Sequence, residues 1–213
     1  MKNLLTTLFL FLALFIAIFM GNDASASANL FGKSEERNSD IDEFPKWIKV
    51  LDKKTEELET FSHKCTSESK AFYCNIKDWR NFVDTLKGKT KPEQINAVNS
   101  YVNAHKYILD INNWGVTDYW ESPGEFLFRN GDCEDFAIIK YLSLKQLGFD
   151  VNDLRVVVLM DNNLGVYHSV LATYIGDDIY ILDNQLFNVT RSTNILHYNP
   201  VYSINEKSWW RYF

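Results

Sequence analysis

Basic residues are scarce in this chain of 213 residues, and their scarcity excludes one class of partner. Lys and Arg number 22 against 28 Asp and Glu, which gives a formal net charge of −6 at pH 7. A nucleic-acid-binding domain normally presents an excess of positive charge, so we expect no nucleic acid as partner. The sequence also lacks internal repeats and low-complexity tracts, and its length is sufficient for one domain with its own core.

Long apolar runs are absent except for one near the start of the chain, over residues 4–20. Lys2 precedes this run, and the small residues ASASAN follow it, which is the layout of a secretory signal peptide. We therefore predict a signal peptide over residues 1–28, cleaved after Ala26 or Ala28, and an exported protein without a stable membrane span. Because the run reaches the lower limit of spanning length, an uncleaved membrane anchor is the alternative.

The residues after the signal are polar, as the stretch GKSEERNSD over 32–40 shows. Such a composition is typical of a mobile segment. We predict a flexible leader over 29–40, followed by a single domain over 41–213.

Cysteines are few, and no CxxC or His/Cys cluster is present, which argues against a structural zinc site. An odd number of cysteines in an exported chain indicates one disulfide and one free thiol. Cys65 and Cys74 are close in a polar stretch and form the natural pair, which leaves Cys133 free. The alternative is that Cys65 and Cys74 are both unpaired.

The spacing of apolar residues predicts helices over 42–61, 79–86 and 93–107. The stretch 110–123 (DINNWGVTDYWESP) is rich in Asn, Asp and aromatic residues and is predicted to be a functional loop. A fourth helix should run from Cys133 to residue 146 or 147.

Cys133 lies within the stretch RNGDCEDFAII, between acids. Asp132 is the expected N-cap of the fourth helix, and apolar residues wrap most of that helix, so it should be central and buried. The helix N-terminus would stabilise a thiolate. Asp132, Glu134 and Asp135 would oppose one, because neighbouring carboxylates raise a thiol pKa unless a cation neutralises them.

Strands are predicted over 154–160, 165–175 and 179–183, the last two forming a hairpin. If residues 176–177 make a two-residue turn, His168 and Asp183 are diagonal neighbours on one face, roughly 7 to 8 Å apart at the backbone. A shift of one residue would place them on opposite faces.

This geometry predicts a nucleophile, a base and an orienting carboxylate in the chain order Cys133, His168, Asp183. The alternative is three unrelated residues. The other histidines, at positions 63, 105 and 197, lack such a context and are predicted to be structural or solvated.

Several stretches resemble one known family. PGEFLFRNGDCEDFAIIKYLSLKQLG, HSVLATY, YILDNQ and NPVYSINEKSWW are similar to the bacterial transglutaminase-like cysteine proteinases of the LapG type, as are FPKWIKVL and INAVNSYVNAHKYILDINNWGVTDYW upstream. The resemblance covers nearly all of the chain after the signal. It implies a papain/transglutaminase-like α+β fold, with N-terminal helices and a central cysteine-bearing helix on an antiparallel sheet, and with catalytic roles for Cys133, His168 and Asp183.

The same resemblance implies a biological role. A periplasmic protease of this family cleaves the N-terminal region of a large surface adhesin, often next to a di-alanine, and thereby promotes biofilm dispersal. An inner-membrane receptor for cyclic di-GMP sequesters the protease. Calcium is required for activity.

Calcium suits the acids beside Cys133, because it prefers six to eight oxygen ligands. We predict Asp132, Glu134 and Asp135 as ligands. Asp118 is a candidate from the loop over 110–123, which we call the aromatic loop. The alternative is that these acids only complement the helix N-terminus.

Two other functions are compatible with these residues. A transglutaminase or deamidase would use the same triad and the same thioester. A catalytically inactive binding module is the third reading, and an intact triad argues against it.

Overall fold

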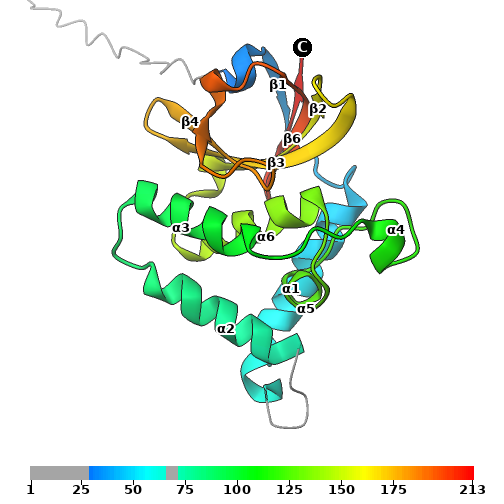
Figure 1. Ribbon diagram of the computed structural model, residues 1–213, viewed down its shortest axis with the longest axis vertical. Helices are drawn as coiled ribbons and strands as arrows, with labels where there is room; N and C mark the ends of the chain where they lie inside the picture. Colours follow the sequence, from blue (N-terminus) through cyan, green and yellow to red (C-terminus); the bar gives the residue numbers. More distant parts are fainter. Residues whose placement is uncertain (1–28, 66–71) are drawn as a thin grey trace, which may run out of the picture.

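The computed structural model describes residues 29–65 and 72–213. The predicted signal peptide over 1–28 lies outside the described residues. Among the helices that are described, none combines the length and the apolar content needed to cross a membrane. The architecture is α+β, and Figure 1 shows the helices gathered on one side of a curved sheet.

Helices fill the first two thirds of the described chain. They are α1 (Pro45–Lys64), α2 (Phe72–Thr85), α3 (Lys91–Asn103), α4 (Asp110–Asn113), α5 (Pro123–Arg129) and α6 (Cys133–Gln146), with the 3-10 turns η1 (Leu30–Gly32), η2 (Val151–Asp153) and η3 (Ser192–Asn194). The strands are β1 (Glu35–Asn38), β2 (Leu154–Asp161), β3 (Val166–Ile175), β4 (Asp178–Leu182), β5 (Thr190–Arg191), β6 (Tyr198–Ile204) and β7 (Trp209–Tyr212). Within the described residues these strands form one antiparallel sheet in the order β1-β7-β6-β2-β3-β4-β5.

The sheet has a core on each face. Successive side chains of a strand point to opposite faces, so one strand contributes to both cores. On β2, Val156 joins the core between sheet and helices, whereas Val157 joins a second core enclosed by the curved sheet. Helix α6 lies on the first face, against β2 and β3. Nearly every side chain of α6 is buried, as its continuous apolar surface predicted.

The predicted hairpin and its register are confirmed. Ile175 pairs with Asp178 and Leu171 pairs with Leu182, so the connection is the two-residue turn 176–177. Gly176 has φ +62°, a conformation that glycine adopts without the steric cost of a side chain. This register places His168 and Asp183 on the same face of the sheet.

The prediction of a flexible leader over 29–40 is wrong for most of that stretch. Glu35–Asn38 is the edge strand β1, paired with β7. Leu30 is fully buried in the second core. A polar composition did not reveal the strand, because an edge strand needs only backbone partners on one side and exposes most of its side chains.

The helix boundaries also needed correction. The second helix begins at Phe72 rather than at residue 79, and the third ends at Asn103 rather than at 107. The predicted loop over 110–123 contains the short α4, and α5 was not predicted at all. The sequence SPGE looks like a turn, but Ser122 and Glu125 form a capping box with proline in the first turn, which is a helix start.

Cys65 and Cys74 form the predicted disulfide, with a Cα–Cα distance of 4.8 Å, and Cys133 is free. The bridge joins the end of α1 to α2. A disulfide stabilises a fold chiefly by restricting the unfolded chain.

We expect a thiol reagent to count one thiol in the denatured, unreduced protein, because Cys65 and Cys74 are bridged. Reduction should lower the free energy of unfolding by about 2 to 3 kcal/mol for so short a loop. Urea unfolding with and without reductant measures this change, and Cys65→Ser with Cys74→Ser is the control that should no longer respond to reductant. A count of three thiols would contradict the bridge.

Candidate active site

Cys133 is the first residue of α6, and the backbone in front of it is fixed by a carboxylate. The N–H of Asp132 donates to Asp135 Oδ2 at 3.0 Å, so the predicted N-cap is confirmed as part of a capping box. Gly131 precedes this turn, and a Cβ at that position would collide with the Asp135 side chain. The glycine therefore allows the closely packed turn that presents the cysteine.

The thiol of Cys133 faces an environment that disfavours its ionised form. Burial raises its pKa, and the charges of Glu134 and Asp132 raise it further. The thiol donates to Glu134 Oε2 at 3.3 Å. The backbone N–H of Ser169 acts in the opposite direction by donating to the sulfur. In the absence of a cation, the neighbouring acids therefore oppose the thiolate of Cys133.

His168 and Asp183 form a buried pair, with 2.9 Å between Nε2 and Oδ1. Burial alone would raise the pKa of Asp183, but the hydrogen bonds from His168, Gln185 and Tyr198 lower it below its ordinary value. With Nε2 turned to the carboxylate, Nδ1 is the ring nitrogen that does not contact Asp183. The amide of Gln185 lies 3.4 Å from that nitrogen.

One cleft of about 280 Å³ contains both the thiol and the imidazole. Its lining residues come from the aromatic loop, the α6 tip and three strands: Thr117, Asp118, Trp120, Asp132, Cys133, Glu134, Val158, Tyr167, His168, Ser169 and Tyr202. Asp183 lies behind His168. The structure therefore brings together the three residues for which a joint role was predicted from the sequence.

The acids near the cysteine also converge. Asp110, Asp118 and Glu134 offer carboxylate oxygens within 4.8 Å of one another, as do Asp110, Asp132 and Asp135. The predicted residues Asp132, Glu134 and Asp118 thus lie in one cluster. Asp135 lies beside them, but its two oxygens accept the backbone N–H groups of Glu121 and Asp132.

Two acids were missed from the sequence: Asp110, which belongs to this cluster, and Glu121, whose pKa is raised by the charges of Asp110 and Asp132. Asp110 was placed in the functional loop without a role, and its carboxylate accepts the N–H of Tyr119. Glu121 lies 11 residues after it in the same loop and is 1% exposed. The density of acids in this loop was the available signal, but spacing in a loop does not show which side chains turn inward.

The donor set fits a hard cation such as calcium. Asp110 Oδ1, Glu121 Oε2 and Asp132 Oδ1 are buried without hydrogen-bond partners among the described residues. Buried oxygens normally have partners, and carboxylate oxygens are the ligands that calcium prefers. Burial raises the pKa of Asp110 to about 6, of Glu121 to about 8 and of Glu134 to about 9, with repulsion from neighbouring acids adding to each.

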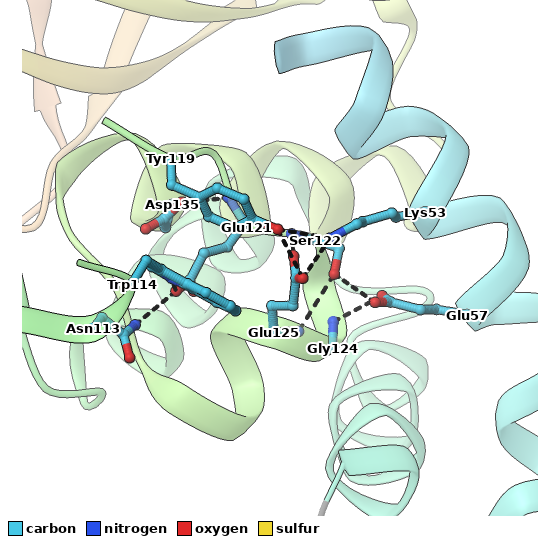
Figure 2. Close-up of polar contacts among 10 residues, drawn as sticks. All are labelled: Lys53, Glu57, Asn113, Trp114, Tyr119, Glu121, Ser122, Gly124, Glu125 and Asp135. Carbon is cyan, nitrogen blue, oxygen red and sulfur yellow. Dashed lines mark hydrogen bonds and ion pairs between the residues drawn. The ribbon is translucent and has the colours of Figure 1, made fainter. Parts of the chain in front are cut away.

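A polar network holds the aromatic loop in place beside this cluster (Figure 2). Glu121 Oε1 accepts from Trp114 Nε1 at 2.6 Å and from Asn113 Nδ2 at 2.8 Å. From α1, Lys53 donates to the hydroxyl of Tyr119 at 2.7 Å, and Glu57 accepts the hydroxyl of Ser122. The loop is therefore tied to α1 on one side and to α6 on the other.

Comparisons with known proteins agree with this geometry. A family model described as bacterial transglutaminase-like cysteine proteinase matches residues 52–211. Legionella pneumophila LapG is 34% identical over 66% of this chain and 79% of its own, with a TM-score of 0.60. Its calcium-bound form is 33% identical over 72% of this chain and 86% of its own, with a TM-score of 0.64, and an EGTA-treated form also matches. No curated protein matches.

In excess chelator, we expect the melting temperature to fall as pH rises from about 5 to about 7. Asp110, Glu121 and Glu134 have folded-state pKa values of about 6, 8 and 9, above the ordinary carboxyl range of about 4. From about pH 5 to about pH 7 the folded protein keeps protons that the unfolded chain has lost, so stability decreases with pH. Above pH 7 the buried Lys140, whose pKa burial lowers to about 7, acts in the opposite direction, because the unfolded chain then holds a proton that the folded protein has lost. Scanning calorimetry across this range measures the trend.

Saturating calcium should weaken this pH dependence, because a bound cation favours the ionised carboxylates. Glu121→Gln should also reduce the slope in chelator. A melting temperature that rises from about pH 5 to about pH 7 in chelator would contradict the assignment of repulsion to these acids.

Proposed function

We propose a function from the premise that this chain belongs to the bacterial transglutaminase-like cysteine proteinase family, whose model spans residues 52–211. The chain is accordingly a transglutaminase-like cysteine protease with a papain/transglutaminase-like α+β fold. One observation carries the proposed assignment of its catalytic residues. Cys133 and His168 line the same cleft, and His168 is paired from behind with the buried Asp183.

In the proposed mechanism, Asp183 accepts the Nε2–H of His168 and thereby leaves Nδ1 free to act as base. Nδ1 takes the thiol proton of Cys133, and the sulfur attacks the carbonyl carbon of the substrate peptide bond. The C–N bond then breaks, and the departing amine takes the proton from the imidazolium. Water, deprotonated by His168, hydrolyses the thioester and restores the thiol.

We propose calcium as the cofactor, held by Asp132, Glu134 and Asp118, with Asp110 and Glu121 contributing further oxygens. Asp135 belongs to the predicted set, and its hydrogen bonds place it as a support of the α6 tip. Bound calcium would neutralise the acids beside Cys133 and so favour the thiolate. The all-oxygen cluster and its unpartnered buried oxygens support this proposal, as does the calcium-bound form of the similar LapG.

The substrate, compartment and partner are proposed from the family resemblance. The protease is exported to the periplasm, where it cleaves the N-terminal region of a large surface adhesin and releases cells from a biofilm. An inner-membrane cyclic di-GMP receptor sequesters it. The apolar run over residues 4–20 and the small residues after it support export.

Cys133→Ala and His168→Ala should abolish cleavage of a candidate adhesin fragment while leaving the fold intact, because their proposed role is chemical. Asp183→Asn should lower the rate about a hundredfold or more through the loss of charge and tautomer control. Gel-based cleavage rates with purified variants test this. Cleavage by Cys133→Ala at the parental rate would exclude Cys133 as the nucleophile.

Removing calcium with a chelator should lower both the melting temperature and the cleavage rate, because a cation that binds only the folded arrangement stabilises it by mass action. Calcium should restore both, and magnesium should do so poorly because it requires a tight octahedron. Asp132→Ala and Glu134→Ala should lose the calcium response, whereas Asp84→Ala, an exposed carboxylate on α2, should keep it. Full activity and unchanged melting in chelator would leave these acids only the role of helix-terminal charges.

Mass spectrometry of the reaction products separates the protease from the transglutaminase or deamidase alternative. Transfer of the acyl group to water at a peptide bond gives two shorter chains with a new carboxyl group. Transfer to a lysine amine gives an isopeptide adduct, and hydrolysis at glutamine gives a glutamate without chain cleavage. We expect the first result, and either of the others would overturn the proposed reaction.

A further inference from the structure

Asp183 is held by more than its histidine. Its Oδ1 accepts both the Nε2–H of His168 at 2.9 Å and the backbone N–H of Gln185 at 2.8 Å. Its Oδ2 accepts the hydroxyl of Tyr198 at 2.6 Å, and this is the one hydrogen bond to Oδ2 from the described part of the chain. Tyr198 and Asp183 are 4% and 1% exposed, so water does not replace a lost partner easily.

The hydroxyl of Tyr198 restricts a rotation that the other bonds leave open. The terminal torsion of an aspartate has a broad preference, so a carboxylate held through one oxygen can turn about that bond. A second donor on the other oxygen fixes the plane of the carboxylate. A fixed plane in turn fixes the direction in which Nε2 of His168 points.

Tyr198 is itself immobilised from behind by the N-terminal turn η1. The ring of Phe31 packs edge-on against that of Tyr198, with 5.8 Å between the centroids. Phe31 has φ +51°, a backbone conformation that is unfavourable for phenylalanine. Such a conformation persists where the surrounding packing fixes the backbone. Leu30 anchors the same turn in the core to which Tyr198 belongs.

We infer that Tyr198 is a positioning residue for the reaction, which acts by fixing the plane and the charge of Asp183 and through it the orientation of His168. This inference rests on the proposed function, because it assumes that Asp183 orients the catalytic base. The two can be tested separately.

The chain offers a matched control in Tyr212. It is 8% exposed and belongs to the same buried cluster as Tyr198. Its hydroxyl bonds Ser203 at 2.7 Å and Arg155 at 3.2 Å. Tyr212→Phe therefore removes a buried, hydrogen-bonded hydroxyl from the same core without touching the pair of His168 and Asp183.

The first measurement is the rate of alkylation of Cys133 by iodoacetamide, at neutral pH in calcium, with the melting temperature recorded for each variant. Cys133 is the free thiol, so the signal is specific. Tyr198→Phe should lower the rate about tenfold or more, the size expected for one lost hydrogen bond to a charged group. Tyr212→Phe should stay within about twofold of the parent, since it lacks contact with the pair.

The same measurement on an Asp183→Asn background decides whether Tyr198 acts through Asp183. If it does, adding Tyr198→Phe to Asp183→Asn should change the rate less than about twofold, because coupled residues are not additive. An equal loss on both backgrounds, or no loss in Tyr198→Phe, would overturn the inference. An unchanged rate in Asp183→Asn itself would instead overturn the proposed triad.

Nitrogen NMR of histidine-labelled protein supplies a signature that a general loss of stability does not produce. The His168 ring should be held as the Nε2–H tautomer in the parent and in Tyr212→Phe. Tyr198→Phe should show a mixture of tautomers, intermediate between the parent and Asp183→Asn. A tautomer in Tyr198→Phe identical to that of the parent would exclude a positioning role.

Discussion

Asp110, Asp132, Glu134 and Asp135 are buried side by side where α6 begins, and their mutual repulsion opposes the folded state. Nearby backbone donors offset part of this cost. Asp135 alone accepts two N–H groups, one from its own helix tip and one from the loop at Glu121. These two bonds place Cys133 and the aromatic loop relative to each other, so the geometry of the cleft depends on a carboxylate that belongs to the repelling cluster.

The aromatic loop owes its position to this arrangement. Trp120 packs into the core against Trp47, and hydrogen bonds tie the loop to α1 and to α6. Trp114 and Asn113 both donate to Glu121, which leaves the other oxygen of Glu121 facing the cluster. A cation in the cluster would therefore act on the loop and on Cys133 together.

Much of the fold was predictable from local patterns. The hairpin register followed from one turn, because side chains alternate with period two and a single pairing fixes every other. Helix α6 followed from its caps and its continuous apolar surface. Strand β1 was not predictable in this way, since its pairing with β7 joins residues at opposite ends of the chain and leaves no local signal.

The same distinction applies to the candidate site. Cys133, His168 and Asp183 were found because one helix tip and one hairpin carry them. Asp110, Glu121 and Tyr198 were missed because their roles arise from contacts across the fold. Tyr198 begins a strand that was not predicted, and nothing in the order of residues shows that its hydroxyl reaches Asp183.

The site has two halves: the pair of His168 and Asp183 on the sheet, and Cys133 with its neighbouring acids at the start of α6. They differ in whether their carboxylate oxygens have hydrogen-bond partners. On the sheet, both oxygens of Asp183 have hydrogen-bond donors. At the α6 tip, three carboxylates keep an oxygen without a partner among the described residues, and Cys133 is surrounded by negative charge. His168 and Asp183 therefore have their hydrogen-bond partners within the protein, whereas acids beside Cys133 keep oxygens without a partner among the described residues. Under the proposed function, a dependence on a cation falls on the part of the site that holds Cys133, because the acids there would make ionisation of the thiol conditional on a bound positive charge.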